Sequence, residues 1–146
     1  MAYDMNIQIV SADQYTGTKF YTFGQKRSLG VRGLQKLVNM VAKYLLTPIG
    51  SDPLDATYGT QIPNLLGSNV TPLDAQDIVQ LAVSDAQAAI QGYQRAMNLP
   101  LDERLLSVTV TGFTILTDSP GFAAQILIRN VQGQGLQFLL PTLQVR

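Results

Sequence analysis

The stretch Asn98-Leu99-Pro100-Leu101-Asp102-Glu103-Arg104-Leu105-Leu106-Ser107-Val108-Thr109-Val110 joins a helical pattern to an alternating one. Proline disfavours helical backbone at the residue before it, so we predict that the preceding helix ends here. Two acids and an arginine follow in a chain that is poor in charge. An arginine beside a carboxylate can form paired, charge-assisted hydrogen bonds that fix direction. We interpret Asp102, Glu103 and Arg104 as a polar joint that organises neighbours.

Composition favours a single domain that is covered by other subunits. The 146 residues fit one compact core. Charged residues make up 14% of the chain, against about 25% in an average soluble domain. A surface enclosed by partners can replace charge with neutral polar groups, whereas a weakly charged monomer is the alternative. Because 10 basic residues balance 10 acidic ones, no general field exists to hold nucleic acid or an anionic membrane.

Several kinds of chemistry are excluded. The chain has no cysteine and no histidine, which removes disulfides, a thiol nucleophile and the commonest metal ligand and general base. Neither Gly17-Thr18-Lys19 nor Gly24–Ser28 has the complete phosphate-loop pattern. We therefore expect no cofactor and no metal. The first residues lack the features of a signal peptide, and no stretch approaches the roughly 20 apolar residues of a membrane span, so we expect the mature protein in the cytoplasm.

Two helices are predicted. Residues 6–10 alternate as a short strand and residues 11–30 form an irregular arm. A first helix should run from Val31 to about Leu46 and end before Pro48. After a loop rich in proline and glycine, Thr71-Pro72-Leu73-Asp74 supplies a cap, a first-turn proline and an acid for a second helix. The predicted apolar faces are Val31, Leu34, Leu37, Val38, Val41 and Leu45 in the first helix, and Ile78, Leu81, Ala82, Ala86, Ala89, Ile90, Tyr93 and Met97 in the second.

The C-terminal third predicts strands. Leu106, Val108 and Val110 alternate on one face, whereas Phe113 and Ile115 follow in the opposite phase, so Gly112 is a candidate β-bulge. Turns are predicted at 118–121 and 132–135, and Pro141 demotes the last strand to an edge. The inward positions of the later strands are Phe122, Ala124, Ile126, Ile128, Leu136, Phe138 and Leu140. We expect an α+β fold, with two main helices on a small antiparallel or mixed sheet of three to four strands, over residues 31–146.

Two passages resemble one protein family over about residues 30 to 140. Leu45-Leu46-Thr47-Pro48-Ile49-Gly50, followed by Tyr58-Gly59-Thr60-Gln61-Ile62-Pro63-Asn64-Leu65-Leu66, is similar to the helix, Thr-x-x-Gly loop and aromatic-Gly turn of the baseplate wedge or sheath-initiator proteins of contractile-tailed bacteriophages. That family has relatives in type VI secretion baseplates. Asp102-Glu103-Arg104-Leu105 is similar to its Glu-Pro-Arg-Ile signature, although Glu103 takes the proline position. Ser51-Asp52 stands where Glu-Arg is common.

The resemblance implies a structural protein of the virion, assembled in the host cytoplasm. It would link baseplate wedges to the tail sheath and template the first sheath ring by accepting a β-strand. The implied partners are the tail sheath protein and wedge subunits, with tube or hub proteins as further candidates. The wedge contact would use Asp102, Glu103 and Arg104, and loop scaffolding Thr47, Gly50, Tyr58 and Gly59. The strand-exchange candidates are Leu136, Phe138, Leu140, Leu143, Val145, Ile7 and Ile9.

Other interpretations of the same residues stay open. The acids and arginine at 102–104 could be an internal cap that ties a helix end to a strand. The basic residues Lys19, Lys26, Arg27 and Arg32 could form a solvated arm or meet an acidic partner. A cell-wall glycosidase would use Glu103 as general acid with Asp52, Asp55 or Asp102, but no carboxylate pair has a defined spacing. A tail completion or connector protein is a further alternative.

Overall fold

The computed structural model describes residues 32–65, 68–116 and 121–140. Its elements in chain order are α1 (Gly33–Leu46), the 3-10 helix η1 (Ile62–Leu65), α2 (Pro72–Arg95), the 3-10 helix η2 (Leu101–Glu103), β1 (Leu105–Ile115), β2 (Phe122–Asn130) and β3 (Gly135–Leu139). The predicted α+β fold with two main helices is confirmed. The strands form one antiparallel sheet in the order β1-β2-β3. The predicted strand at 6–10, the arm, Val31 and most of the 118–121 turn lie outside the described residues, as do Leu143 and Val145.

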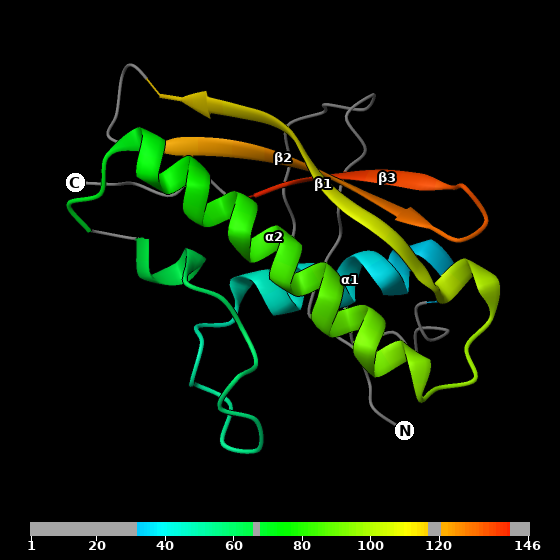
Figure 1. Ribbon diagram of the computed structural model, residues 1–146. Coiled ribbons are helices and arrows are strands. Elements are labelled where there is room, and N and C mark those ends of the chain that lie inside the picture. Colours follow the sequence, from blue (N-terminus) through cyan, green and yellow to red (C-terminus); the bar gives the residue numbers. More distant parts are fainter. Residues whose placement is uncertain (1–31, 66–67, 117–120, 141–146) are drawn as a thin grey trace, which may run out of the picture.

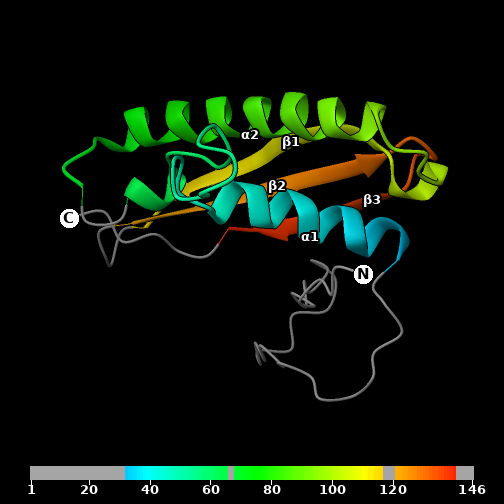
Figure 2. The same ribbon diagram turned by 90° about the horizontal axis from the view of Figure 1, so that it is seen from below.

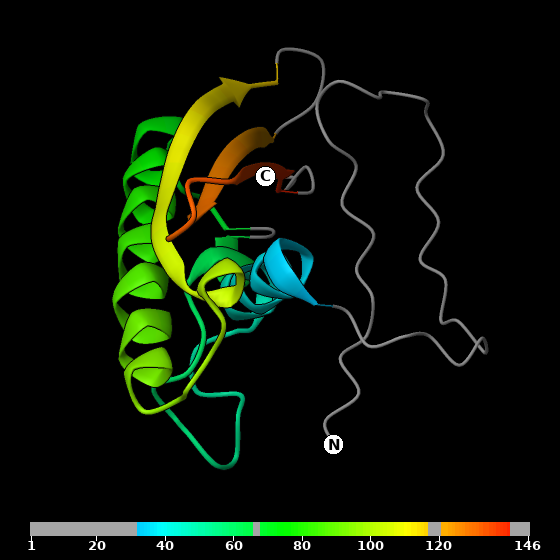
Figure 3. The ribbon, with the colours of Figure 1, turned by 90° about the vertical axis from the view of Figure 1, so that its right-hand side faces the viewer.

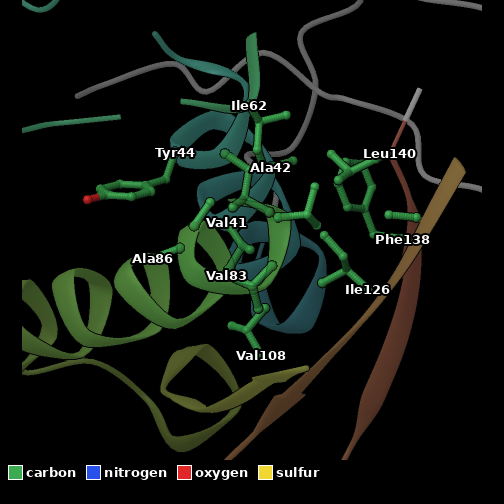
Figure 4. Close-up of a cluster of buried hydrophobic side chains, with 14 of the residues drawn as sticks. Val41, Ala42, Tyr44, Ile62, Val83, Ala86, Val108, Ile126, Phe138 and Leu140 are labelled. Carbon is green, nitrogen blue, oxygen red and sulfur yellow. The ribbon is translucent and has the colours of Figure 1, made fainter. Parts of the chain in front are cut away.

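The helices and the sheet enclose one core (Figures 1, 2 and 3). Helix α2 runs along β1, and α1 lies below β2 and β3 (Figure 3). Figure 4 shows side chains from both helices and all three strands converging in the space between them. Such a two-layer arrangement buries one apolar stripe of each helix against one face of a sheet. The largest fully buried side chains are Phe122, Leu37, Leu45, Ile62, Ile90, Ile126, Ile128, Leu140, Val38, Val41, Val79 and Asn130.

Helix α1 follows the sequence pattern closely. The predicted residues Leu37, Val38, Val41 and Leu45 are buried, and Leu34 packs partly against the core. The helix ends at Leu46, and Thr47 before Pro48 is already extended, as the steric restriction before proline requires.

Helix α2 begins as predicted, but its buried face differs from the prediction. The Thr71 hydroxyl accepts a hydrogen bond from the Asp74 amide at 3.2 Å, and Pro72 occupies the first turn. Leu81, Tyr93 and Met97 were predicted to face the core, yet 64%, 42% and 53% of their surfaces are exposed. The buried residues are Ala75, Val79, Ala82, Val83, Ala86, Ile90 and Gln94. Alanines lie along two adjacent stripes of this helix, so the apolar periodicity does not decide which stripe is buried. Contact with β1 decides it.

Strand β1 is irregular at two places, of which the sequence predicted one. The register with β2 shifts between Val110 and Gly112, which confirms the bulge predicted there. A second shift lies between Leu105 and Ser107. It buries Leu105 and leaves 50% of Leu106 exposed, so the prediction that Leu106 shares the inner face with Val108 is wrong.

The remaining strands match the prediction. Phe122, Ala124, Ile126 and Ile128 are all buried. Phe138 and Leu140 continue the inner face, and Leu136 is partly buried against it. The predicted turn at 132–135 is a hairpin in which the Asn130 amide donates to the Gln134 carbonyl at 3.0 Å.

The corrected face of α2 predicts a difference between two substitutions. Ile90→Ala should lower the free energy of unfolding by about 2–5 kcal/mol because it opens a cavity in the core, whereas Leu81→Ala should change it by no more than about 0.5 kcal/mol because Leu81 lies in solvent. Urea unfolding followed by circular dichroism measures both. A loss at Leu81 as large as that at Ile90 would restore the face predicted from the sequence.

Candidate functional site

The acids and arginine at 102–104 lie where α1, α2 and β1 meet. The turn η2 carries the chain from the end of α2 into β1, and the Glu103 amide donates to the Pro100 carbonyl at 3.1 Å. This turn directs the Glu103 side chain inward, where only 8% of its surface is exposed. One carboxylate oxygen lies 2.7 Å from the Lys36 ammonium, and the other accepts a hydrogen bond from the Gly33 amide at 3.2 Å. Glu103 therefore caps the N-terminus of α1 and forms an ion pair on its first turn.

The surroundings of Glu103 favour its charged form. Burial raises the pKa of its carboxyl group, but the hydrogen bonds from Lys36 and the Gly33 amide, together with the charges of Lys36 and Arg32, outweigh burial and bring the pKa below its ordinary value. A general acid at neutral pH needs the opposite shift. The geometry thus speaks against Glu103 as the acid of a glycosidase.

Gly33 is required at the start of α1. Its φ angle is +63°, in the left-handed region that favours glycine. A Cβ atom there would lie 2.9 Å from a carboxylate oxygen of Asp102. The first residue of α1 and η2 can approach closely because no side chain stands between them.

Two buried amide side chains complete the junction. Gln94, on α2, donates to the Glu103 carbonyl at 2.9 Å and accepts from the Leu105 amide at 2.7 Å. Asn130, at the end of β2, donates to the Asp102 carbonyl at 3.1 Å and accepts from the Gln134 amide at 2.9 Å. Sequence reasoning missed both residues. The one available signal was their polar type at positions whose neighbours in the helix or strand pattern are apolar.

Arg104 does not pair with either acid. Its Nε donates to the Leu99 carbonyl at 2.8 Å, and the ion pair found among the described residues joins Lys36 and Glu103. The expectation of a paired arginine and carboxylate at this place is therefore wrong. The reason is the direction of the chain: η2 turns Glu103 towards α1 before Arg104 begins the extended segment. Asp102 and Arg104 are both half-buried.

The residues expected to scaffold the loop form its neck. The Thr60 amide donates to the Thr47 carbonyl at 2.8 Å, and the Ile49 amide donates to the Thr60 carbonyl at 3.0 Å. The rings of Tyr58 and Tyr44 meet edge to face with centroids 4.9 Å apart. Gly50 has a φ angle of +80°. Gly59, at φ +106°, lies so close that an added Cβ would collide with the Thr47 carbonyl oxygen.

The first half of one sheet edge, at β1, is covered by side chains of α2. Gln87, Gln91 and Gln94 recur on one side of α2, at the spacing that keeps helical residues on one face. Gln87 accepts from the Val108 amide at 2.9 Å, and Gln91 donates to the Leu106 carbonyl at 3.0 Å. With Gln94 on the Leu105 amide, these side chains occupy outward-pointing backbone groups in the first half of β1.

The other edge, at β3, is open among the described residues. Leu136 and Phe138 pair with Ile128 and Ile126, and the Leu140 amide donates to Ala124 at 2.9 Å. Backbone groups alternate sides along a strand, so those of Gln137 and Leu139 point away from β2. No residue in the described ranges forms a hydrogen bond with them. The backbone groups of the candidates Leu136, Phe138 and Leu140 therefore bond within the sheet. The backbone groups that face outward belong to Gln137 and Leu139. Ile7, Ile9, Leu143 and Val145 lie outside the described residues.

Comparison with known proteins, and a search for metal sites and membrane-spanning helices, assign no function to the chain. No protein-family model and no curated protein matches this sequence. In the described part of the chain, no group of three His, Cys, Asp or Glu residues could hold a metal ion, and no helix there has the length and apolarity to cross a bilayer.

The Glu103 junction predicts a dependence of stability on acid. Because the folded-state pKa of Glu103 lies below its unfolded value of about 4.3, its contribution is complete above that value and is lost as the pH falls through the lower folded pKa. Glu103→Gln should cost about 1–3 kcal/mol at pH 7 and less at pH 3. Urea unfolding at both values checks this, with Asp77→Asn on the exposed side of α2 as control. An equal loss at both pH values would contradict the assigned charge.

The neck of the loop predicts a contrast between two glycines of positive φ. Gly59→Ala should destabilise the protein by more than Gly133→Ala, because both impose a strained backbone but only the first drives a methyl group into backbone atoms. Gly133 has no atom within 4 Å of the added Cβ, so it measures strain alone. Thermal unfolding compares the two variants. Equal melting temperatures for the two variants would contradict a tight backbone contact at Gly59.

Proposed function

We propose that this chain is a structural protein of a contractile-tail baseplate, in which it links the wedges to the sheath and starts the first sheath ring. The observation that carries the proposal is the outer edge of β3, with which no described residue forms a backbone hydrogen bond. A strand from the tail sheath protein would add there and extend the sheet of this chain. The protein would then reside in the virion after assembly in the host cytoplasm.

The asymmetry of the two edges supports this choice. An uncovered edge strand offers a row of amides and carbonyls that recruits other chains, and proteins usually cover or charge such an edge. The glutamines of α2 cover outward-pointing backbone groups in the first half of β1. The chain places uncharged Gln137 and Leu139 at the edge positions of β3. Backbone recognition there would supply affinity, and side chains alternating along the added strand would supply specificity.

The side facing the wedge is proposed at the junction. Because Glu103 is buried on α1, Asp102 and Arg104 are the residues of this group that could meet another subunit. Arg104 commits its Nε to Leu99, which leaves the end of its guanidinium for a partner carboxylate. Glu103 would then hold the junction in shape for that contact. This division combines the two interpretations of the motif, an internal tie and a contact.

The strand-addition step is tested by removing one outward-pointing amide. Leu139→Pro deletes the N–H that an added strand would use, and proline is tolerated on an edge strand whose N–H faces outward. Leu139→Ala keeps the N–H and removes most of the side chain. With the sheath protein of the same tail and the assembled wedges, Leu139→Pro should reduce sheath initiation at least about tenfold, while Leu139→Ala should preserve most of it.

Electron microscopy of reconstituted tails counts the baseplates that carry a sheath. Circular dichroism checks whether both variants are folded. Sheath growth on the Leu139→Pro baseplates at the wild-type level would refute strand addition at β3.

A further inference from the structure

The loop between Thr47 and Thr60 presents an apolar side chain at its tip. Leu54 has 95% of its surface exposed, the largest fraction among the exposed large hydrophobic residues of the described chain. In Figure 1 the loop projects from the lower side of the molecule, away from the sheet. A leucine held in water in this way contributes nothing to the core, and its burial against a partner would be favourable.

This loop has a defined shape. Backbone hydrogen bonds close its neck at Thr47 and Thr60. Within it, the Asp52 carboxylate accepts from the Leu54 amide at 2.8 Å. The Asp55 carboxylate accepts from the Tyr93 hydroxyl of α2 at 2.9 Å and from the Thr57 amide at 2.9 Å. A loop ordered before binding loses little conformational entropy when it docks.

The tip carries negative charge on both sides of Leu54. Asp52 precedes it by two residues and Asp55 follows it. Hydrogen bonds from Thr57 and then Tyr93 lower the pKa of Asp55, so its carboxyl group is ionised at neutral pH. Neither acid forms an ion pair with a described residue. The tip is thus an apolar anchor between two carboxylates, and it calls for an apolar recess that has cations at its rim.

An open hollow that combines exposed apolar side chains with two arginines lies on the same molecule. This hollow of about 420 Å³ is lined by residues from the end of α2 and the start of β1. These parts of the two elements lie at the right of Figure 1. The lining residues of the hollow are Gln91, Gln94, Arg95, Met97, Arg104, Leu105 and Val131. It contains two guanidinium groups and no acid. Met97 and Val131 have 53% and 46% of their surfaces exposed. Methionine and arginine are typical of protein interfaces.

We propose that the Leu54 loop of one copy docks into this hollow on the next copy. Leu54 would cover Met97 and Val131, and the carboxylates of Asp52 and Asp55 would face Arg95 and Arg104. The two surfaces differ, so the contact is head to tail and builds a ring if the rotation closes, or an open chain if it does not.

The inference goes beyond the proposed function. Arg104 belongs both to this hollow and to the proposed wedge contact, so a wedge subunit and a second copy compete for it. The association therefore concerns the protein before it enters a baseplate. Failure of the contact between copies would leave the strand-addition test at Leu139 unaffected, because β3 is not part of either surface.

The full chain tests the proposal by sedimentation velocity over a range of concentrations at low salt. The wild type should associate, and salt should weaken the association because the charges meet near solvent. Leu54→Ser should raise the dissociation constant about tenfold or more. Leu73→Ser is the matched control, because Leu73 is 70% exposed on α2 and lies in neither surface; it should associate like the wild type.

A mixing experiment tests the head-to-tail geometry. Leu54→Ser keeps the hollow and Arg95→Glu keeps the loop, so an equimolar mixture should form one-to-one dimers that grow no further. Since the chain has no cysteine, a mixture of Leu54→Cys and Val131→Cys should give a single disulfide-linked heterodimer. A wild-type monomer up to about 1 mM, or unchanged association of Leu54→Ser and Arg95→Glu, would overturn the proposal.

Discussion

The buried carboxylate of Glu103 holds the two helices and the sheet in one arrangement. It neutralises Lys36 and caps the first amide of α1, while its own backbone carbonyl is held by Gln94 of α2. Taking a charge out of water is costly unless it is paired and hydrogen-bonded. A shift of α1 would break the contacts of Glu103 with Lys36 and Gly33 and leave a buried charge unpaired, so these contacts fix the position of the helix. Because α1 lies below β2 and β3, the position of that helix also sets the platform on which the open edge of the sheet rests.

A second constraint is the different treatment of the two sheet edges. Helix α2 lies along β1 and supplies glutamine side chains to its backbone groups. These amides mimic a neighbouring strand, since each can donate and accept like a peptide group. No described element does this for β3. The first half of β1 is thus covered, whereas no covering contact reaches the outer edge of β3 from the described residues. Most proteins cover or charge the outer strand of a sheet, so β3 differs from a typical edge strand.

Much of the fold was predictable because it depends on local chemistry. The cap at Thr71, the end of α1 before Pro48, the bulge near Gly112 and the inner face of β2 each follow from a few adjacent residues. The rotation of α2 was not predictable in this way. Its alanines fit two neighbouring stripes, and the choice depended on glutamine contacts to a strand that begins ten residues beyond its end. The exposed position of Leu106 likewise depended on a register shift against β2.

The sequence by itself determined which segments become helix or strand, that the class is α+β, and that residues 102–104 form a polar junction. Those features depend on backbone sterics, capping and periodicity, which act over a few residues. Only the tertiary structure decided that Glu103 pairs with Lys36 instead of Arg104, that α2 covers the first half of β1, and that no described residue covers the outer edge of β3. Each of these depends on which groups meet across 11 or more residues of chain, as Gln94 and Leu105 do. Such long-range contacts depend on burial and on the hydrogen bonding of polar groups throughout the core. The local sequence pattern therefore does not predict them.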